Sequence, residues 1–261
     1  MKEDSRDSRA ALLELHELEM RFGGITALRG LTYEVPANII QAVIGPNGAG
    51  KTTLFHCISG LLRPTSGRIV FEGREIDGML PNRITRRGIS RTFQHVALFR
   101  SMTVLENVML GRHPRTHRGF LSTGLRLPGM RSEERRIRKD AEEYLEFVGL
   151  SDARGLPAGS LPLGKQKILE IARALATEPS LVLLDEPAGG LNMKETEELG
   201  ELIRRIRTRG VTVLLVEHDM NLVMEISDRI LVLHYGQRLA SGTPDEVKDH
   251  PAVIEAYLGG E

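Results

Sequence analysis

The stretch Gly45-Pro46-Asn47-Gly48-Ala49-Gly50-Lys51-Thr52-Thr53 decides the fold of this chain. Its first eight residues match the phosphate-loop pattern G-x-x-x-x-G-K-[ST] at every fixed position. The apolar run 39–44 before it predicts a buried strand, and the residues from Lys51 onward predict a helix. The pattern needs this strand–loop–helix context, because loop amides and a helix N-terminus together surround the phosphate.

Each residue type in this loop has a chemical use. Glycine lets the backbone amides turn inward toward phosphate oxygens. Lys51 brings a full positive charge to the β and γ phosphates, and the hydroxyl of Thr52 suits Mg²⁺. The alternative is a glycine-rich turn beside an ordinary lysine. We predict ATP and Mg²⁺ as cofactors, with nucleotide contacts from Gly45, Pro46, Asn47, Gly48, Ala49, Gly50, Lys51, Thr52 and Thr53.

Two acids follow a second apolar run, at the point where a buried strand would end. Residues 181–184 read Leu-Val-Leu-Leu, and Asp185 and Glu186 come directly after them. Ligands of open α/β sheets bind at the carboxyl ends of the strands. We therefore expect Asp185 to hold Mg²⁺ through water and Glu186 to polarise an attacking water as general base. The alternative is a solvated strand end.

His218 occupies a comparable position after the apolar residues 211–216. Since three strands would end at the same edge, we expect its imidazole to hydrogen-bond the γ-phosphate or the attacking water. The alternative is a structural histidine at a strand end.

The remaining pattern predicts an α/β protein with a β-rich opening. Alternating apolar residues over 12–22, with one slip that suggests a bulge, predict a strand, as do 31–35 and 67–71, with a Pro36-containing turn after the second. In the second half, apolar strands, including 230–233, alternate with expected helices. One helix is expected over 132–148, with Ser132 as its cap, and another over 165–177. A third should begin at Asn192, where Glu195 completes a capping box. Such alternation predicts a parallel sheet covered on both faces.

Composition excludes several classes of protein. The 261 residues carry 35 Lys or Arg and 35 Asp or Glu, so a nucleic-acid binder with a large basic face is not expected. No apolar run approaches the roughly 20 residues of a membrane-spanning helix. Residues 1–10 alternate charges without a signal-peptide core, which predicts a flexible tail. Cys57 is the one cysteine, so no intramolecular disulfide forms, and we expect a cytoplasmic protein.

The order of these motifs resembles that of ATP-binding-cassette (ABC) ATPases from about Leu12 onward. The phosphate loop is followed by Arg-Thr-Phe-Gln-His at 91–95, Leu-Pro-Leu-Gly at 161–164, Leu-Leu-Asp-Glu-Pro at 183–187 and Glu-His-Asp at 217–219. The resemblance implies a single domain over 11–261. It would combine a phosphate-loop NTPase core, its parallel sheet, an N-terminal antiparallel β subdomain, and a helical subdomain at about 95–176 that holds the signature loop.

The same resemblance implies roles for residues outside the phosphate loop. Gln94 would touch Mg²⁺ and water and sense a membrane partner, and Phe22 would stack on adenine. The alternatives are a solvated loop glutamine and a core phenylalanine. Leu161 and Gly164 belong to the signature loop, which clasps the γ-phosphate bound on the other subunit, and residues 190–192 would cross the dimer seam. Such proteins work as dimers with two nucleotides between the subunits.

A narrower similarity concerns the ATP subunits of bacterial branched-chain amino-acid importers. Residues 91–99, 102–108, 228–233 and 240–244 carry it, and the insertion 111–149 resembles one of the two ATP subunits of such importers. Related subunits serve urea and other amides. The similarity implies membrane permease subunits, a second ATP-binding subunit in a homo- or heterodimer, an indirect role for a periplasmic binding protein, and a peripheral location on the inner face of the cell membrane.

The chain departs from the family at the signature, which usually begins Leu-Ser-Gly-Gly-Gln. Pro162 has neither a hydroxyl nor a backbone N–H to give a γ-phosphate, whereas Gly164 keeps its amide and Lys165 adds a charge. We therefore hypothesise a different ATP subunit as partner, with an intact signature, and two unequal sites.

The segment 112–139 is basic, with nine Lys or Arg against two Glu. Such a segment could lie near anionic lipid headgroups or an acidic partner. The alternative is a solvated loop and helix face.

Two other functions compete with a transport motor. A non-transport cassette ATPase acting on DNA or ribosomes usually carries a coiled-coil insertion or two tandem cassettes, and this chain shows one cassette and no heptad run. A phosphate-loop kinase of a small molecule needs neither Glu186 beside Asp185 nor a signature loop.

Overall fold

The computed structural model describes residues 11–92, 96–112 and 130–258. The predicted flexible tail 1–10, the candidate Gln94 and most of the basic segment 112–139 lie outside the described residues.

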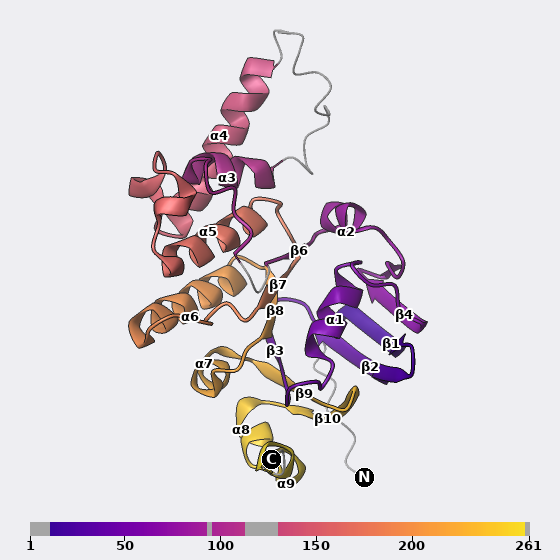
Figure 1. Cartoon of the computed structure of the whole chain (residues 1–261). Helices are drawn as coiled ribbons and strands as arrows, with labels where there is room; N and C mark the ends of the chain where they lie inside the picture. Colours follow the sequence, from indigo (N-terminus) through magenta and orange to yellow (C-terminus); the bar gives the residue numbers. More distant parts are fainter. Residues whose placement is uncertain (1–10, 93–95, 113–129, 259–261) are drawn as a thin grey trace.

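A mainly parallel sheet runs through the middle of the described part of the chain (Figure 1). Its six described strands lie in the order β10-β9-β3-β8-β7-β6. Their bounds are Gln237–Gly242, Arg229–His234, Ile40–Ile44, Thr212–Val216, Leu181–Asp185 and Ile89–Arg91. All neighbouring pairs are parallel except β10 with β9. The strand before the phosphate loop, β3, therefore lies beside β8, and β8 lies beside β7.

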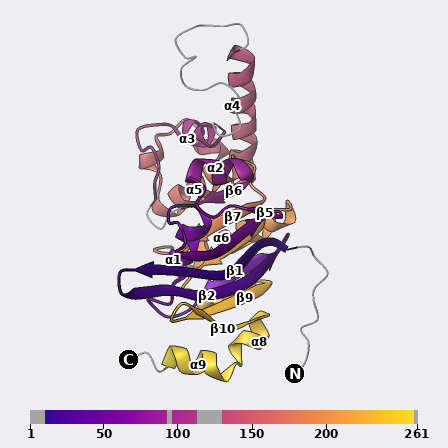
Figure 2. The same cartoon turned by 90° about the vertical axis from the view of Figure 1, so that its right-hand side faces the viewer.

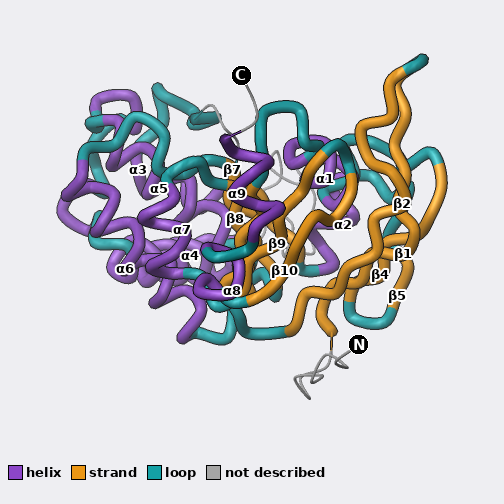
Figure 3. Tube along the Cα trace, turned by 90° about the horizontal axis from the view of Figure 1, so that it is seen from below, coloured by secondary structure: helices purple, strands orange, loops and turns teal. Residues whose placement is uncertain are grey.

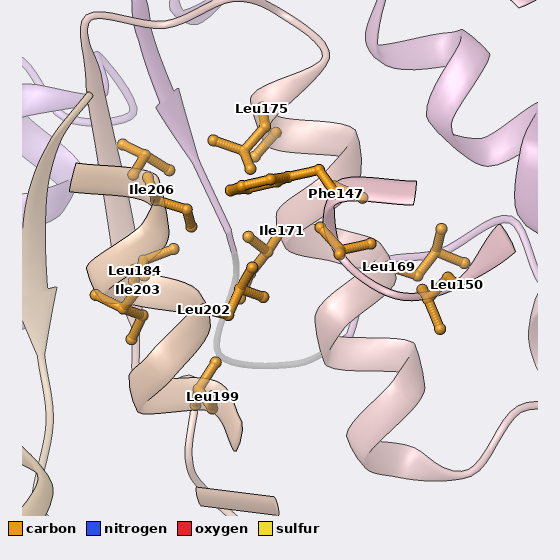
Figure 4. Close-up of a cluster of buried hydrophobic side chains, with 14 of the residues drawn as sticks. Phe147, Leu150, Leu169, Ile171, Leu175, Leu184, Leu199, Leu202, Ile203 and Ile206 are labelled. Atoms are coloured by element: carbon orange, nitrogen blue, oxygen red, sulfur yellow. The ribbon is translucent and has the colours of Figure 1, made fainter. Parts of the chain in front are cut away.

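Both faces of this sheet are covered, as the unbroken apolar strands predict. In β7, Val182 and Leu184 face a core that is shared with α5 (Leu163–Leu175) and α6 (Met193–Thr208) (Figure 4). Leu181 and Leu183 face a second core on the other side, together with α1 (Lys51–Ile58) and the antiparallel sheet. A strand that is buried on both faces carries apolar residues at every position, because successive side chains point to opposite faces.

The antiparallel sheet has the described strand order β2-β1-β4-β5. The bounds are Ile25–Pro36 for β2, Ala11–Phe22 for β1, Ser66–Phe71 for β4 and Arg74–Glu75 for β5. The predicted bulge is confirmed, because the pairing of β1 with β2 shifts register between Leu15 and Leu18. The predicted turn that contains Pro36 begins one residue later in the structure. Pro36 is the last residue of β2, since proline keeps an extended backbone at a strand end.

Helices gather at two ends of the central sheet. At one end lie α3 (Val104–Gly111), α4 (Met130–Phe147) and α5, with short 3₁₀ turns at Ser151–Ala153 and Ala158–Ser160. Figure 2 shows α4 projecting away from the sheets at that end and α8 and α9 at the other. The remaining helices are α2 (Pro81–Arg87), α7 (Met220–Ile226), α8 (Pro244–Lys248) and α9 (Pro251–Leu258). Seen from below, α3, α4, α5, α6 and α7 lie on one side of the central strands, and the antiparallel sheet lies on the other (Figure 3).

The predicted helix ends are partly confirmed. Asn192 caps α6 and forms the expected capping box with Glu195, in which each side chain accepts from the other residue's backbone N–H. The prediction that Ser132 caps a helix is wrong, because α4 begins at Met130. Ser132 lies inside the first turn of α4, because a capping residue is only one of several local influences on where a helix begins. Likewise α5 begins at Leu163, after Pro162, whose fixed φ suits the entry to a helix.

Candidate nucleotide-binding site

The phosphate loop connects β3 to α1, as predicted, with its glycines in conformations that other residues rarely adopt. The φ values are +149° at Gly45, +77° at Gly48 and +104° at Gly50. Asn47 and Gly48 form the exposed tip, while Pro46 is half-buried and Ala49 is buried. Gly50 caps α1 in the left-handed conformation without a side-chain cap, so the first turn of the helix opens directly onto the loop.

Two of these glycines are also required by close packing. A Cβ atom at Gly45 would lie 2.1 Å from the carbonyl oxygen of Leu233 in β9. At Gly50 it would lie 2.6 Å from the carbonyl oxygen of Ala27 in β2. The loop is thus enclosed by both sheets, which fixes its backbone before any ligand arrives.

Lys51 folds back over the loop. Its Nζ donates to the carbonyl oxygens of Gly45 at 2.6 Å and Pro46 at 3.0 Å, and the side chain is buried. Burial lowers the pKa of Lys51, while the negative charges of Glu186 and Asp185 act to raise it. The two carboxylates therefore lie within electrostatic reach of the loop lysine, as the parallel arrangement of β3, β8 and β7 requires.

Asp185 is the last residue of β7, and Glu186 follows it with a left-handed φ of +49°. The Asp185 side chain is almost fully buried and accepts a hydrogen bond from the Arg91 Nη2 at 2.7 Å. Arg91 ends β6, the neighbouring strand, and its other terminal nitrogen donates to the hydroxyl of Ser59 at 3.1 Å. This buried ion pair fixes the direction of the Asp185 carboxylate.

Glu186 and His218 meet, as the positions of their strands predict. The His218 Nε2 lies 3.0 Å from the Glu186 Oε1, and both side chains are partly exposed. With Glu186 ionised, the imidazole is the donor in this contact, because a carboxylate only accepts. The backbone N–H of Glu186 donates to the carbonyl oxygen of Val216, which ties the end of β7 to the end of β8.

The oxygen ligands that suit a magnesium ion are the exposed hydroxyl of Thr52 at the start of α1 and the Asp185 carboxylate. Among the residues that the structure describes, no group of three or more His, Cys, Asp or Glu side chains could hold a metal. Mg²⁺ usually binds through one or two protein oxygens plus substrate phosphates, so this sparse set fits Mg²⁺ delivered with a nucleotide.

The signature segment, Leu161–Gly164, lies on the opposite face of the central sheet from α1 (Figure 1). Leu161 is buried in the helical core, and Pro162 caps α5 without a side-chain hydrogen bond. A Cβ atom at Gly164 would lie 2.7 Å from the Glu195 Oε1 of α6. The described contacts of this segment are therefore with α6 and the loop after β7, not with the phosphate loop of the same chain.

Phe22 ends β1 with its side chain 45% exposed, so the alternative of a core phenylalanine is wrong. Gly23 and Gly24 follow it, and a Cβ atom at either would meet nothing within 4 Å. An exposed ring at such an open turn leaves room for a flat ligand. Gln94 lies outside the described residues, so its expected role stays a prediction.

Three charged residues of the site, whose side chains are buried, received no role from the sequence: Arg91, Lys167 and Glu217. Arg91 pairs with Asp185, Lys167 donates to the Glu186 carbonyl oxygen at 3.1 Å, and Glu217 accepts from the Ala188 N–H at 2.6 Å. A signal was available for two of them, because each is a charged residue at a position where the sequence pattern predicts burial. Glu217 directly follows an apolar strand, and Lys167 lies on the apolar side of α5.

Comparison with protein families gives two matches. Residues 28–189 match the ABC transporter family, and residues 237–261 match a family described as branched-chain amino acid ATP-binding cassette transporter. The first match spans the phosphate loop and Glu186 together.

Individual proteins are similar over almost the whole chain. The high-affinity branched-chain amino acid transport ATP-binding protein BraF of Pseudomonas aeruginosa is 47% identical over 249 residues, 95% of this chain and 98% of that protein. LivG of Escherichia coli, with the same description, is 46% identical with the same coverage. A probable LivG of Archaeoglobus fulgidus is 35% identical and covers 96% of both chains.

Solved structures agree with the fold. A nucleotide-free ATP-binding cassette from an ABC transporter superposes with a TM-score of 0.84 at 32% identity, covering 97% of this chain and 100% of that chain. The ADP conformation of MJ1267, also an ATP-binding cassette, gives the same values. The expected phosphate-loop core, with an antiparallel sheet beside it, is confirmed.

Proposed function

The chain belongs to the ABC transporter family of ATP-binding proteins, whose members hydrolyse ATP to drive transport, and from this premise we propose its cargo, partners and site. We propose that it is the motor subunit of an importer for branched-chain or related amino acids. The relatives named for such transport, and the family that matches residues 237–261, support this cargo. The competing cargo is urea or another amide, because the nucleotide subunit does not contact what is carried.

One observation carries the assignment of the hydrolytic site: the Glu186 carboxylate, held at 3.0 Å by His218, lies within electrostatic reach of Lys51 on the phosphate loop. A carboxylate placed beside a phosphate site can take a proton from water, which suits hydrolysis. A kinase would instead need room for an acceptor hydroxyl at this place.

The proposed mechanism assigns one task to each group. Lys51 leaves the carbonyl oxygens of Gly45 and Pro46 and pairs with the β and γ phosphates. Glu186 takes the proton of the attacking water, and His218 holds the carboxylate in place through the Nε2. When bound through Thr52 and Asp185, Mg²⁺ supplies charge neutralisation at the phosphate oxygens.

The remaining predicted residues are proposed for nucleotide and partner contacts beyond the phosphate loop. The described contacts of Gly164 are with Glu195 and Leu191, and Leu161 is buried in the helical core, away from the core that holds α1. We assign Leu161 and Gly164 to the nucleotide of a second ATP-binding subunit. Phe22 is assigned to adenine, and Gln94 to Mg²⁺, water and the membrane partner.

Transport requires partners in the membrane. No helix among the described residues is long and apolar enough to span a bilayer. We propose that separate permease subunits form the pathway, that this chain binds them peripherally at the inner face of the cell membrane, and that a periplasmic binding protein delivers the cargo. No nucleic acid is proposed as a partner, given the balanced charge of 35 basic and 35 acidic residues.

The test is uptake of radiolabelled leucine, isoleucine and valine by cells that lack the chromosomal copy and carry this chain or its Glu186→Gln variant. Urea and acetamide serve as competing cargoes. A matched control is Glu198→Gln, an exposed acid on α6. We expect leucine-type uptake with the native chain and the control and none with Glu186→Gln. Uptake of urea alone would overturn the cargo, and a phosphorylated metabolite in place of free phosphate would overturn the motor.

A further inference from the structure

The loop that follows β7 is attached to two other elements through two buried charged side chains. Lys167 lies on α5 and is 9% exposed, and Glu217 lies directly after β8 and is 4% exposed. Charged side chains are seldom buried to this degree without specific partners, because a charge that leaves water loses its hydration. Their partners are backbone groups of the loops that carry Glu186 and His218.

Glu217 joins the two catalytic loops. Its Oε1 accepts from the N–H of Ala188 at 2.6 Å. Its Oε2 accepts from the N–H of His218 at 2.9 Å and from that of Asp219 at 3.4 Å. One carboxylate therefore fixes the backbone two residues after Glu186 and the backbone of the histidine that contacts Glu186.

Lys167 connects the same loop to α5. Its Nζ donates to the carbonyl oxygen of Glu186 at 3.1 Å, and this oxygen also accepts from the N–H of Gly189 at 3.2 Å. A Cβ atom at Gly189 would lie 3.5 Å from the same Nζ, so the lysine head is seated against the loop. Burial lowers the pKa of Lys167, and the charge of Glu217 is the largest influence in the opposite direction.

The loop is thus held at the Glu186 carbonyl oxygen from α5 and at the Ala188 N–H from the end of β8. Glu186 itself has a left-handed φ of +49°, a conformation that non-glycine residues rarely adopt and that needs support from its surroundings. These two attachments supply that support at the carbonyl oxygen of Glu186 and two residues after it. The first turn of α5, four residues before Lys167, holds the signature segment.

We propose that Lys167 and Glu217 are positioning residues that set the Glu186 carboxylate for hydrolysis and link its placement to the position of α5. The inference rests on the proposed role of Glu186 as general base. It gives α5 a second use: the helix that carries the signature segment at its start would also hold, one turn later, the backbone of this chain's own base.

The test compares variants of the full chain, assayed with its membrane partners for ATP turnover and by calorimetry for ATP binding. Lys167→Met keeps the length and removes the donor, Lys167→Arg restores a donor, and Glu217→Gln keeps the shape and removes one acceptor. Lys248→Met, an exposed lysine on α8, is the matched control. Melting temperatures of all variants show which of them fold.

We expect Lys167→Met to lower kcat about 10-fold or more with an ATP dissociation constant changed by less than about 2-fold, since misplacement of a catalytic group by an ångström is costly. Lys167→Arg should recover most of the rate, and the control should match the native chain. Lys167→Met and Glu217→Gln together should cost less than the product of the two single losses, because both act on one loop.

Three results would overturn the link: an unchanged kcat in Lys167→Met, equal losses in Lys167→Arg and Lys167→Met, or losses in kcat and ATP affinity by the same factor. Should Lys167→Met fail to fold, the comparison of Lys167→Arg with Glu217→Gln decides, since full activity in a folded Glu217→Gln also defeats the proposal. Normal hydrolysis by Glu186→Gln would instead remove the proposed base, so the two failures are distinguishable.

Discussion

The phosphate loop and the signature segment are both glycine-containing entries to a helix, yet they differ in what holds them. Gly45 and Gly50 in the phosphate loop are enclosed by backbone carbonyls of Leu233 and Ala27. Gly164 in the signature segment faces side chains, those of Leu191 and of Glu195, whose other carboxylate oxygen serves the capping box of α6.

The difference explains which of the two matches its family pattern. Two sheets specify the backbone of the phosphate loop, so glycine is needed there whatever the ligand. At the signature segment, Pro162 and Leu163 are exposed. Leu161 and Gly164 are buried, and these two keep the usual residues at their places. On the proposed role of this segment, the donors that Pro162 lacks for a partner's phosphate fall at an exposed position of this chain.

The largest effect is expected at the phosphate-loop side. Glu186→Gln keeps the shape but cannot take a proton, so turnover should fall by about 10²–10⁴-fold while ATP still binds. Steady-state phosphate release with the membrane partners measures it, with Glu198→Gln as control. Near-normal release would show that the base is another group.

The next effect tests whether the two regions serve different nucleotides. In a complex with a different ATP subunit, removal of Glu186 should abolish most turnover, whereas removal of the partner's base glutamate should remove little. The reason is that Pro162 deprives the partner's site of donors, and one lost donor to a developing charge costs about 10²–10³-fold. Equal residual turnover in the two single variants contradicts unequal sites, as does a fully active homodimer.

Lys51→Ala should weaken ATP binding without preventing folding. The lost charge-assisted contact is worth roughly 1.5–3 kcal/mol, about 10- to 150-fold in the dissociation constant. Calorimetry with ATP measures it, and Lys248→Met is the control. An unchanged constant would move the phosphate site elsewhere.

A pair of glycine variants separates packing from conformation within the phosphate loop. Gly45→Ala meets the Leu233 carbonyl oxygen at 2.1 Å, whereas Gly48→Ala, also at positive φ, meets nothing within 4 Å. Overpacking typically costs about 1–3 kcal/mol, so Gly45→Ala should be the less stable by that amount in chemical denaturation. Equal midpoints would mean that β9 gives way and does not enclose the loop.

The smallest effect is expected at Cys57, on α1 behind the phosphate loop. Burial raises the pKa of this thiol from 9.0 to about 11. At pH 8 the thiolate is therefore roughly 100-fold scarcer than in the unfolded chain, and alkylation should be slow until denaturant is added. Since the folded pKa is the higher one, its contribution to stability is complete below pH 9.0 and is lost as pH rises toward about 11. Fast labelling of the native chain would show that α1 opens.

Much of the site could be predicted because its residues are adjacent in sequence to apolar strands. Asp185, Glu186 and His218 follow such strands, and the strand order β3-β8-β7 brings them together as expected. Arg91 could not be assigned in this way, because its pairing with Asp185 depends on β6 lying beside β7. Nor could the start of α4 be located from Ser132, since a capping residue is only one of several local influences on where a helix begins.

The sequence by itself determined the phosphate loop, the two acids and the buried parallel strands, because each of these is a local pattern with a fixed period or spacing. The family was indicated by resemblance, from the order of the motifs along the chain. Only the tertiary structure decided that Lys167 and Glu217 hold the loop of Glu186, that Gly45 is enclosed by β9, and that α5 and α1 lie on opposite faces of the sheet. These facts join residues far apart in the chain. Contacts of that kind depend on which strands become neighbours, and no local pattern encodes the identity of the partner.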